Sequence, residues 1–303
     1  MLSLRLHRYL VLGLLLSVSA AIASALTVGA YNVENYTLAD RMVDGVYRKA
    51  YPKPEAEKQA LRESIRGFAP DILALEEMGG PPFLAELQAD LKAAGLDYPH
   101  ATVLEAADND RHVAILSKLP FKDVRRHTQV GFKYFGQPDL VKRGVLEVTF
   151  ATTAGDLTVF VIHLKSKRTE RKDDPESTLQ RELEATAVRD LVLARFPDPK
   201  QAKFIVCGDW NDTRRSKPVR SLLKRGDTEL GELLRAYDSR GETWTHFYRA
   251  EESYTRIDYL LASPGLLPFV GHKGTAKIHD GPGVREASDH RPVYVELKLA
   301  PAP

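Results

Sequence analysis

The sequence has very little cysteine: Cys207 is the only one among 303 residues. An internal disulfide is therefore excluded, and the folded chain must be stabilised by its core. No CxxC or HExxH spacing occurs, so the usual zinc sites are not indicated. The sequence also contains no fixed-period repeat and no low-complexity block after residue 26. These absences exclude disulfide scaffolds and solenoids, and they leave an ordinary globular class.

Long apolar runs are also scarce, and the one candidate lies at the start of the chain. Arg5 and Arg8 precede an apolar stretch, and Ala23-Ser24-Ala25 follows it as a small-residue cleavage signal. This order predicts a signal peptide over residues 1–25 and a secreted or periplasmic protein. The alternative is an uncleaved membrane anchor, because the stretch from Tyr9 to Leu26 reaches the lower length limit for a bilayer span.

The chain has no formal net charge once residues 1–25 are set aside. The chain has 43 basic and 41 acidic residues, and the two arginines of the segment account for the difference. The overall charge therefore gives no argument for nucleic-acid binding, and only local basic clusters can support it.

What the remainder does contain is a succession of short apolar runs separated by amphipathic segments. Helices are expected after Pro54, across Phe83–Leu91 and over 177–196, the last carrying Leu179, Leu183 and Leu191. Residues 144–150 and 156–165 look like a hairpin, beside strands separated by helices, so mixed sheets are expected. The pattern predicts one α/β domain over residues 26–303, with two packed sheets and outer helices. The expected strands are LTVGAYNVE, DILALEE, HVAILS, GVLEVTFAT, LTVFVIHLK, KFIVCGDW, RIDYLLAS and RPVYVELKL.

Polar side chains interrupt these apolar strands at their ends. Taken singly, each is typical of a turn cap or a solvated group. Together, six strand ends offer carboxylates, carboxamides or imidazoles, which favours a functional site. Alternation along a strand would also place His163, Lys165 and Lys167 on one face. The strand-end residues are Asn32 and Glu34, Glu77, His163, Asp209 and Asn211, Asp258, and Asp289 and His290.

The residue types of this set indicate the chemistry. Oxygen ligands from Asp, Glu and Asn suit a hard cation, Mg²⁺ or Mn²⁺. A hard cation with imidazoles and nearby lysines is suited to hydrolysing phosphate esters. The cation and the lysines neutralise phosphate oxygens, and the other groups take up and donate protons.

The segments YNVEN, DILALEEM, HVAILSKLP, VIHLKSK, GDWND, RIDYLL and SDHRPV occur in one order over about residues 27–299. In this order and at these separations, the chain resembles the endonuclease/exonuclease/phosphatase superfamily, in the branch of deoxyribonuclease I and the bacterial sphingomyelinases. The resemblance implies a four-layer α/β sandwich of two mixed β-sheets with helices on the outer faces.

The resemblance also implies a role for each residue. Asp258 would fix the tautomer of His290, and His163 would act as a general acid or a phosphate donor. Glu76 stands where Gln is usual. The carboxylate that orients the first histidine in some members is replaced by His112, so the partner of His163 stays open. The implied catalytic residues are His163, His290, Asp209, Asn211 and Asp258; the implied metal ligands are Asn32, Glu77 and Asp289; the implied substrate-binding residues are Lys165, Lys167 and Arg111.

Several substrates could use such a site. A nuclease acting on DNA or RNA is preferred, because basic clusters lie at Lys165–Lys172, Arg125–Arg126 and Arg214–Arg225. A sphingomyelinase-like phospholipid phosphodiesterase, a phosphomonoesterase and an inactive binding module are the alternatives; Gly131–Phe135 could form a short membrane hairpin. A calcineurin-like metallophosphoesterase is rejected, since its later histidine motifs are missing. No stable protein partner is implied, and a monomer is expected.

Overall fold

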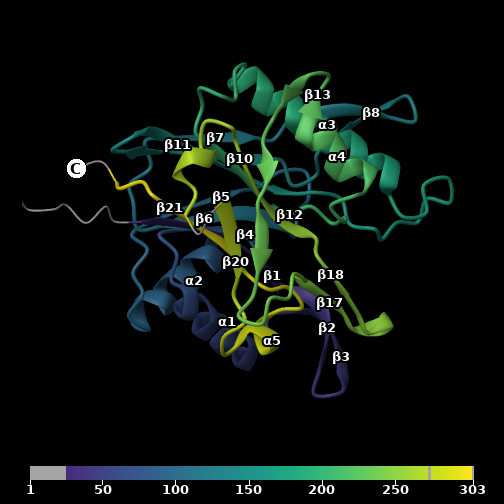
Figure 1. The fold of residues 1–303 in the computed structure, drawn as a ribbon. Helices are drawn as coiled ribbons and strands as arrows, with labels where there is room; N and C mark the ends of the chain where they lie inside the picture. The colour runs from purple at the N-terminus through teal and green to yellow at the C-terminus, as the bar shows by residue number, and fades with distance from the viewer. Residues whose placement is uncertain (1–24, 272–273, 302–303) are drawn as a thin grey trace, which may run out of the picture.

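The computed structural model describes residues 25–271 and 274–301, and two large β-sheets form the centre of this part of the chain (Figure 1). The first sheet has seven strands and the second has six. Three strand pairs are parallel, β1 with β4, β11 with β12 and β16 with β20, and the remaining pairs are antiparallel, so both sheets are mixed as expected. The predicted signal peptide, apart from Ala25, lies outside the described residues.

The strands of the first sheet, in spatial order, are β16 (Arg235–Tyr237), β20 (Thr275–Ile278), β21 (Val293–Leu297), β1 (Leu26–Tyr36), β4 (Ile72–Met78), β6 (His112–Ser117) and β5 (His100–Leu104). Those of the second are β15 (Glu232–Leu233), β19 (Asp258–Ala262), β12 (Phe204–Asp209), β11 (Gly155–His163), β10 (Val145–Thr152) and β7 (Asp123–His127). Four two-stranded hairpins are formed by β2 (Ala39–Val43) with β3 (Val46–Tyr51), β8 (Gly131–Tyr134) with β9 (Gln137–Leu140), β13 (Lys224–Arg225) with β14 (Thr228–Glu229), and β17 (His246–Tyr248) with β18 (Ser253–Thr255).

Helices cover the outer face of each sheet. They are α1 (Glu55–Phe68), α2 (Pro81–Ala93), α3 (Thr178–Arg195), α4 (Lys217–Leu223) and α5 (Val284–Ala287), with short 3₁₀ turns at Arg249–Glu251 and Leu267–Phe269. No helix in the described ranges is long and apolar enough to cross a bilayer.

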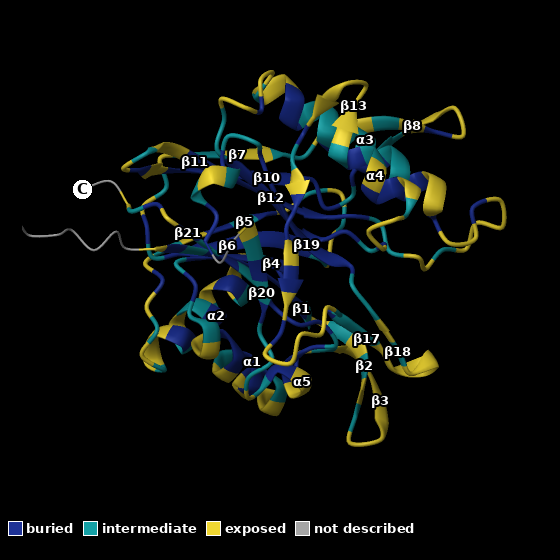
Figure 2. Ribbon diagram, in the orientation of Figure 1, coloured by how far each residue is buried: buried dark blue, intermediate teal, exposed yellow. Residues whose placement is uncertain are grey.

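The layers follow from the alternation of side chains along each strand. In β1, Val28 and Ala30 pack between the two sheets, while Tyr31 and Val33 pack on the other face beneath α1 and α2. The second sheet repeats this arrangement, with its outer face against α3 and α4. Figure 2 shows the strands of both sheets as the buried centre of the molecule. The structure is therefore the four-layer α/β sandwich that the resemblance implies.

Helix α3 occupies the range expected from the sequence. Leu179 is exposed, and the buried face carries Arg181 and Glu184 beside Val188 and Val192. Arg181 and Glu184 find buried partners near the ends of β12 and β11. Helix α1 agrees with its signals: it follows Pro54, buries Leu61 and Ile65, and ends at Ala69 in the left-handed conformation.

Candidate active site

Asp209 ends β12 at the centre of a buried polar cluster. Its Oδ2 atom lies 3.1 Å from Asn32 Nδ2, which donates a hydrogen bond from β1 of the other sheet. The same oxygen lies 3.5 Å from His163 Nε2 and 3.8 Å from His290 Nε2. Asn211 completes the cluster, since its backbone N–H donates to Asp209 Oδ1 at 2.8 Å and its side chain donates to Oδ2 at 3.2 Å. The strand ends therefore meet around one carboxylate.

A glycine makes this meeting possible. Gly208 has φ +128°, and a Cβ atom at this position would lie 2.0 Å from the carbonyl oxygen of Ile162 in the parallel neighbour β11. Only glycine tolerates both the angle and the close approach. Trp210, two residues after Gly208, is fully buried, and its ring packs on that of Tyr259 with 5.3 Å between the ring centroids. Asp209 is thus turned toward the site while Trp210 anchors the strand end in the core.

His290 and Asp258 form a pair across the seam between the sheets. Nδ1 of His290 lies 3.1 and 3.0 Å from the two carboxylate oxygens of Asp258. Because an ionised carboxylate only accepts, Nδ1 is the donor and Nε2 is directed toward Asp209 and Asp289. Burial alone would lower the pKa of His290, but Asp258 and Asp209 raise it well above its ordinary value. His290 is therefore held as a cation.

His163 has the opposite character. Burial lowers its pKa well below the ordinary value, and the positive charges of Arg143, His290 and Arg111 add to this effect. Its Nδ1 has no hydrogen-bond partner among the described residues, and no carboxylate orients it there. The carboxylate that His163 faces is Asp209, 3.5 Å from its Nε2, and the side chain can act as a neutral hydrogen-bond donor or acceptor.

The carboxylates of the site are crowded and buried. Burial raises the pKa of Asp209 to about 7, with Asp258 and Glu77 adding to the rise. Burial and the charge of Asp289 raise the pKa of Glu34 to about 6. Burial would also raise the pKa of Asp289, but His246, His290 and Lys53 hold it below its usual value. Burial is the largest cause of the raised pKa values of Asp209 and Glu34, and a bound cation would favour the ionised form of these carboxylates.

The three residues implied as metal ligands lie around this cluster. Asn32 contacts Asp209, and Asp289 Oδ1 lies 3.9 Å from His290 Nε2. Glu77 has φ +59°, a strained angle for a residue other than glycine, at the irregular end of β4. Its Oε2 accepts the backbone N–H of Asn35 at 3.0 Å. The strained turn directs Glu77 to the rim of the site.

The three residues implied as substrate ligands are placed differently. Arg111 lies at the rim, where its Nε donates to Asn35 Oδ1 at 2.8 Å and lies 4.0 Å from Glu77 Oε2. Lys165 and Lys167 follow the end of β11 at His163, so the expected continuation of the strand through them was wrong. Lys165 Nζ donates to the carbonyls of Ser166 and Arg168. Lys167 is exposed and lies 3.6 Å from Glu176.

Three residues of the site were not assigned roles from the sequence. Arg143 is buried, pairs with Asp108 at 2.8 Å, and its Nη1 has no hydrogen-bond partner among the described residues. His246, on β17, places its Nε2 3.6 Å from Asp289 Oδ2 and its ring 4.6 Å from that of His290. The only signal for Arg143 in the sequence was weak, a lone arginine before an apolar strand. Nothing in the sequence singled out His246.

Glu76 is the third such residue, although its unusual identity was visible. It is fully buried and neither side-chain oxygen has a hydrogen-bond partner among the described residues. Burial, with the charges of Asp258 and Asp209, raises its pKa well above the ordinary value. A neutral carboxylic acid has the shape and the donor of a glutamine side chain, so the departure from the family pattern is a small one.

Asp212 does not belong to the site. Its Oδ2 accepts hydrogen bonds from Nε and Nη2 of Arg181 on α3, at 3.0 and 2.9 Å. This buried pair fixes the loop after β12 against the helix. The acidic sequence GDWND therefore divides into a site residue, Asp209, and a structural one, Asp212.

Comparisons with known proteins give the family of the chain and its fold. The family model described as the Endonuclease/Exonuclease/phosphatase family matches residues 29–290. No curated protein sequence matches the chain significantly.

Solved structures give similarity at the level of the fold. Beta toxin of Staphylococcus aureus, in a mutant with bound magnesium ions, has a TM-score of 0.66 at 17% identity, covering 90% of this chain and 99% of that one. Sphingomyelinase C of Streptomyces griseocarneus gives 0.61 at 17%, covering 90% and 99%. The catalytic domain of human nocturnin, with a bound sulfate anion, gives 0.60 at 17%, covering 91% and 95%. Because the model match spans most of the sequence, the chain belongs to the Endonuclease/Exonuclease/phosphatase family.

Proposed function

We propose that this chain is a metal-dependent phosphodiesterase that hydrolyses DNA or RNA by water attack on phosphorus. The observation that carries the proposal is the position of Asp209 Oδ2, within 4 Å of His163 and of His290, with Asp258 holding His290 from behind. A base, Asp209, and two hydrogen-bond donors for phosphate oxygens, His163 and His290, therefore lie close together.

The residues present fit a hard divalent cation. Their donors are carboxylate and amide oxygens, which suit Mg²⁺ or Mn²⁺. Burial raises the pKa values of Asp209 and Glu34, neighbouring carboxylates add to the rise, and a bound cation would offset both effects. Glu77, Asp289 and Asn32 would hold the ion. When bound, the ion supplies positive charge to a phosphate oxygen.

The side chains supply the remaining chemistry. Asp209, with a pKa near 7 from burial, is suited to accept the proton of the attacking water as the water oxygen bonds to phosphorus. Asn211 orients that carboxylate through two hydrogen bonds. His290 is held as a cation with Nε2 facing the site, and it can donate to a phosphate oxygen as negative charge develops there. His163 can donate from Nε2 to a second oxygen.

Polynucleotides are favoured as substrate by the surroundings of the site. Arg111 at the rim and Arg143 beneath it add guanidinium groups that suit phosphate. The short hairpin that was considered for membrane entry keeps its Phe135 ring 45% exposed, and the Arg171 guanidinium lies 4.4 Å from the centre of that ring. The phospholipid alternative is therefore left to the test below. Export through the N-terminal segment, and action as a monomer, are further parts of the proposal.

The test is turnover of four substrates by the purified protein: DNA, RNA, sphingomyelin and a simple phosphomonoester, each with Mg²⁺, Mn²⁺ or EDTA. We expect polynucleotide cleavage that EDTA abolishes. His290→Ala should reduce turnover by about two or more orders of magnitude, the usual effect of losing an acid–base group. The matched control is His100→Ala, whose ring packs on Phe121 away from the site. Turnover confined to sphingomyelin or to the phosphomonoester would contradict the substrate, and full activity in EDTA would contradict the metal.

A further inference from the structure

A small hollow of about 190 Å³ lies directly beside Asp289. Three aromatic residues, Trp244, Phe247 and Tyr254, and three arginines, Arg249, Arg285 and Arg291, contribute to its wall. None of these six residues takes part in the chemistry proposed above. The hollow nevertheless touches a residue of the site, so a group bound in it would belong to the same substrate.

The aromatic rings of the hollow are stacked and firmly placed. The rings of Phe247 and Tyr254 lie 4.7 Å apart at 28°, and that of Trp244 meets Tyr254 edge-on at 4.8 Å. The backbone N–H of Phe247 donates to the carbonyl of Asp289 at 2.9 Å. The β17–β18 hairpin is thereby joined to the segment before β21, which carries Asp289 and His290. Tyr254 keeps 56% of its surface exposed, so one face of this stack remains available to a ligand.

The charge of the hollow is predominantly positive. Arg291 is buried, pairs with Asp238 at 2.7 Å, and lies 4.0 Å from the centre of the Trp244 ring. Arg249 and Arg285 form no ion pair with another described residue, so their charges stay available for a ligand. Asp289 is the acidic residue of the lining, and it faces the proposed metal site.

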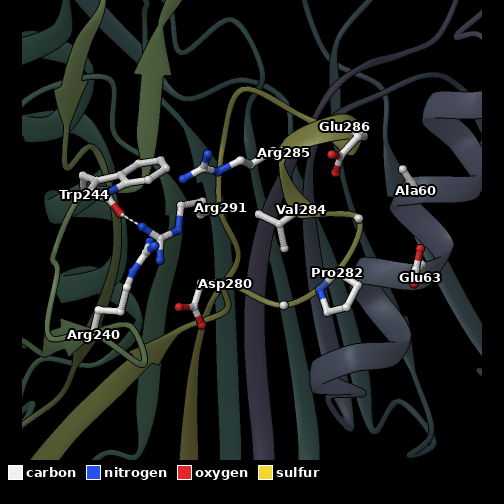
Figure 3. A pocket seen from close by; sticks show the side chains of 12 residues that line it. Ala60, Glu63, Arg240, Trp244, Asp280, Pro282, Val284, Arg285, Glu286 and Arg291 are labelled. Carbon is white, nitrogen blue, oxygen red and sulfur yellow. Dashed lines mark hydrogen bonds between the residues drawn. The ribbon is translucent and has the colours of Figure 1, made fainter.

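A larger hollow, of about 720 Å³, adjoins the first and shares Trp244, Arg285 and Arg291 with it. Figure 3 shows this larger hollow, with Arg285 extending from α5 toward Trp244 and Arg291. The two hollows therefore lie next to each other with part of their walls in common, and the larger one is also lined by three acidic residues, Glu63, Asp280 and Glu286.

Size and charge together select the class of ligand. The smaller hollow lies below the range of roughly 300–1,000 Å³ typical of sites for drug-sized ligands, so it suits a single ring system. Aromatic walls accept either a planar base or a quaternary ammonium group. The two guanidinium groups that form no ion pair with a described residue, those of Arg249 and Arg285, repel an ammonium but attract a nucleotide, which is anionic. The charge therefore favours a base over choline.

We propose that this hollow binds the base of a nucleotide adjoining the scissile phosphodiester, with the base stacked on Tyr254. The inference rests on the proposed function, which it deepens by making the substrate a polynucleotide whose bases contribute to binding. It also makes single-stranded or locally opened nucleic acid the preferred form, since a paired base cannot enter.

The first experiment measures binding and needs no turnover. Calorimetry with AMP and with ribose 5-phosphate compares two ligands that differ by the base alone. We expect AMP to bind about 5- to 150-fold more tightly, the effect of one base–aromatic stack. Trp244 lines the hollow and Trp210 is fully buried. Quenching of tryptophan fluorescence by AMP but not by ribose 5-phosphate would therefore show that the base binds beside Trp244.

Variants at Tyr254 sharpen this comparison. Tyr254→Ala should bring the affinity for AMP down to that for ribose 5-phosphate, while Tyr254→Phe keeps the ring and the affinity. Tyr47→Ala is the matched control, an exposed tyrosine on the β2–β3 hairpin that lines neither hollow. Equal affinity of the unmodified protein for the two ligands, or tighter binding of phosphocholine than of AMP, would overturn the proposal.

The second experiment separates the base site from the proposed function. Single-stranded DNA oligonucleotides with all bases, and the same oligonucleotides built from abasic residues, are compared as substrates. We expect kcat/KM to fall by about 5- to 150-fold without bases, and Tyr254→Ala to reduce cleavage of the first substrate to that of the second. Equal cleavage of both would overturn the base site and leave the nuclease standing. Base-dependent AMP binding without polynucleotide cleavage would uphold the base site and contradict the nuclease.

Discussion

Asp258 holds His290 through both of its carboxylate oxygens, at 3.1 and 3.0 Å from Nδ1, although Asp258 begins β19 of the second sheet and His290 lies in the segment before β21 of the first. Both side chains are buried, so water does not compete for these bonds. The pair settles which nitrogen of His290 faces the site, and it explains why an aspartate is needed at the start of β19.

The replacement Asp258→Asn tests this orienting role. The amide can donate to Nδ1, which would place the proton of a neutral imidazole on the wrong nitrogen. We expect kcat to fall by about two or more orders of magnitude while KM changes little. Steady-state kinetics and a thermal melt would be measured together. A loss of activity matched by a loss of folded protein would instead make the pair structural.

Magnesium should stabilise the protein through the acidic cluster. At a concentration a hundred times Kd, a ligand that binds only the folded state adds about 2.7 kcal/mol to the free energy of unfolding. The melting temperature should therefore rise by several degrees, and Glu77→Gln should remove most of this rise. Glu229→Gln, at an exposed position on β14, is the control. An unchanged rise in the Glu77 variant would contradict its role as a ligand.

Salt dependence tests the contacts proposed for Arg111 and Lys167. If each meets one phosphate of a polynucleotide, its replacement by alanine should reduce the slope of log affinity against log salt by about 0.7 to 0.9. Hydrolysis of a phosphomonoester should hardly respond to Lys167→Ala, since Lys167 lies in the exposed loop after β11. The control is Lys92→Ala, which removes a cation on α2 that is paired with Asp97. If the slope of log affinity against log salt stayed unchanged in both variants, Arg111 and Lys167 would not contact the phosphates of the substrate.

Arg181→Ala should destabilise the protein strongly. The change leaves Asp212 buried without its partner, and breaking such a pair costs about 3–5 kcal/mol. The exposed pair of Lys122 with Asp156 offers the comparison, because Lys122→Ala should cost less than about 1 kcal/mol. Urea unfolding measures both. Equal costs would show that the Arg181 pair is not desolvated.

Glu184 should make stability depend on pH. Burial raises its pKa to about 7 from an ordinary value of 4.5, against the opposing effect of Arg143. Between these values the folded chain holds a proton that the unfolded chain has released, so stability falls as pH rises, by at most about 3 kcal/mol for this residue. Glu184→Gln keeps an oxygen for the backbone N–H of Lys165 and should flatten this fall. Urea unfolding at pH 5 and pH 8 gives the comparison; parallel losses in both proteins would contradict the assignment.

The sequence was most informative where a polar residue ended an apolar strand. Asp209, His163 and Asp258 could be found in this way, because alternation and strand ends are local properties of the chain. Residues that join the site through distant packing could not. His246 reaches Asp289 only because the β17–β18 hairpin is bonded to the segment before β21. No local pattern records that contact.

The error at the end of β11 has a related cause. Period-two spacing assigned Lys165 and Lys167 to a strand face, but β11 ends at His163, where the chain turns to meet α3. There a polar tertiary contact, the hydrogen bond from the backbone N–H of Lys165 to Glu184, outweighed the local pattern.

The site is divided between the two sheets. Asn32 and Glu77 belong to β1 and β4 of one sheet, and His163 and Asp209 to β11 and β12 of the other. Neither sheet holds a complete set, so the proposed catalysis would depend on the register in which one sheet lies against the other. Mild pressure or denaturant that shifts the sheets by about an ångström should reduce turnover by about a hundredfold, while each sheet keeps its own hydrogen bonds. Under the proposed function, activity would therefore report the alignment of the two sheets more sensitively than a measurement of secondary structure.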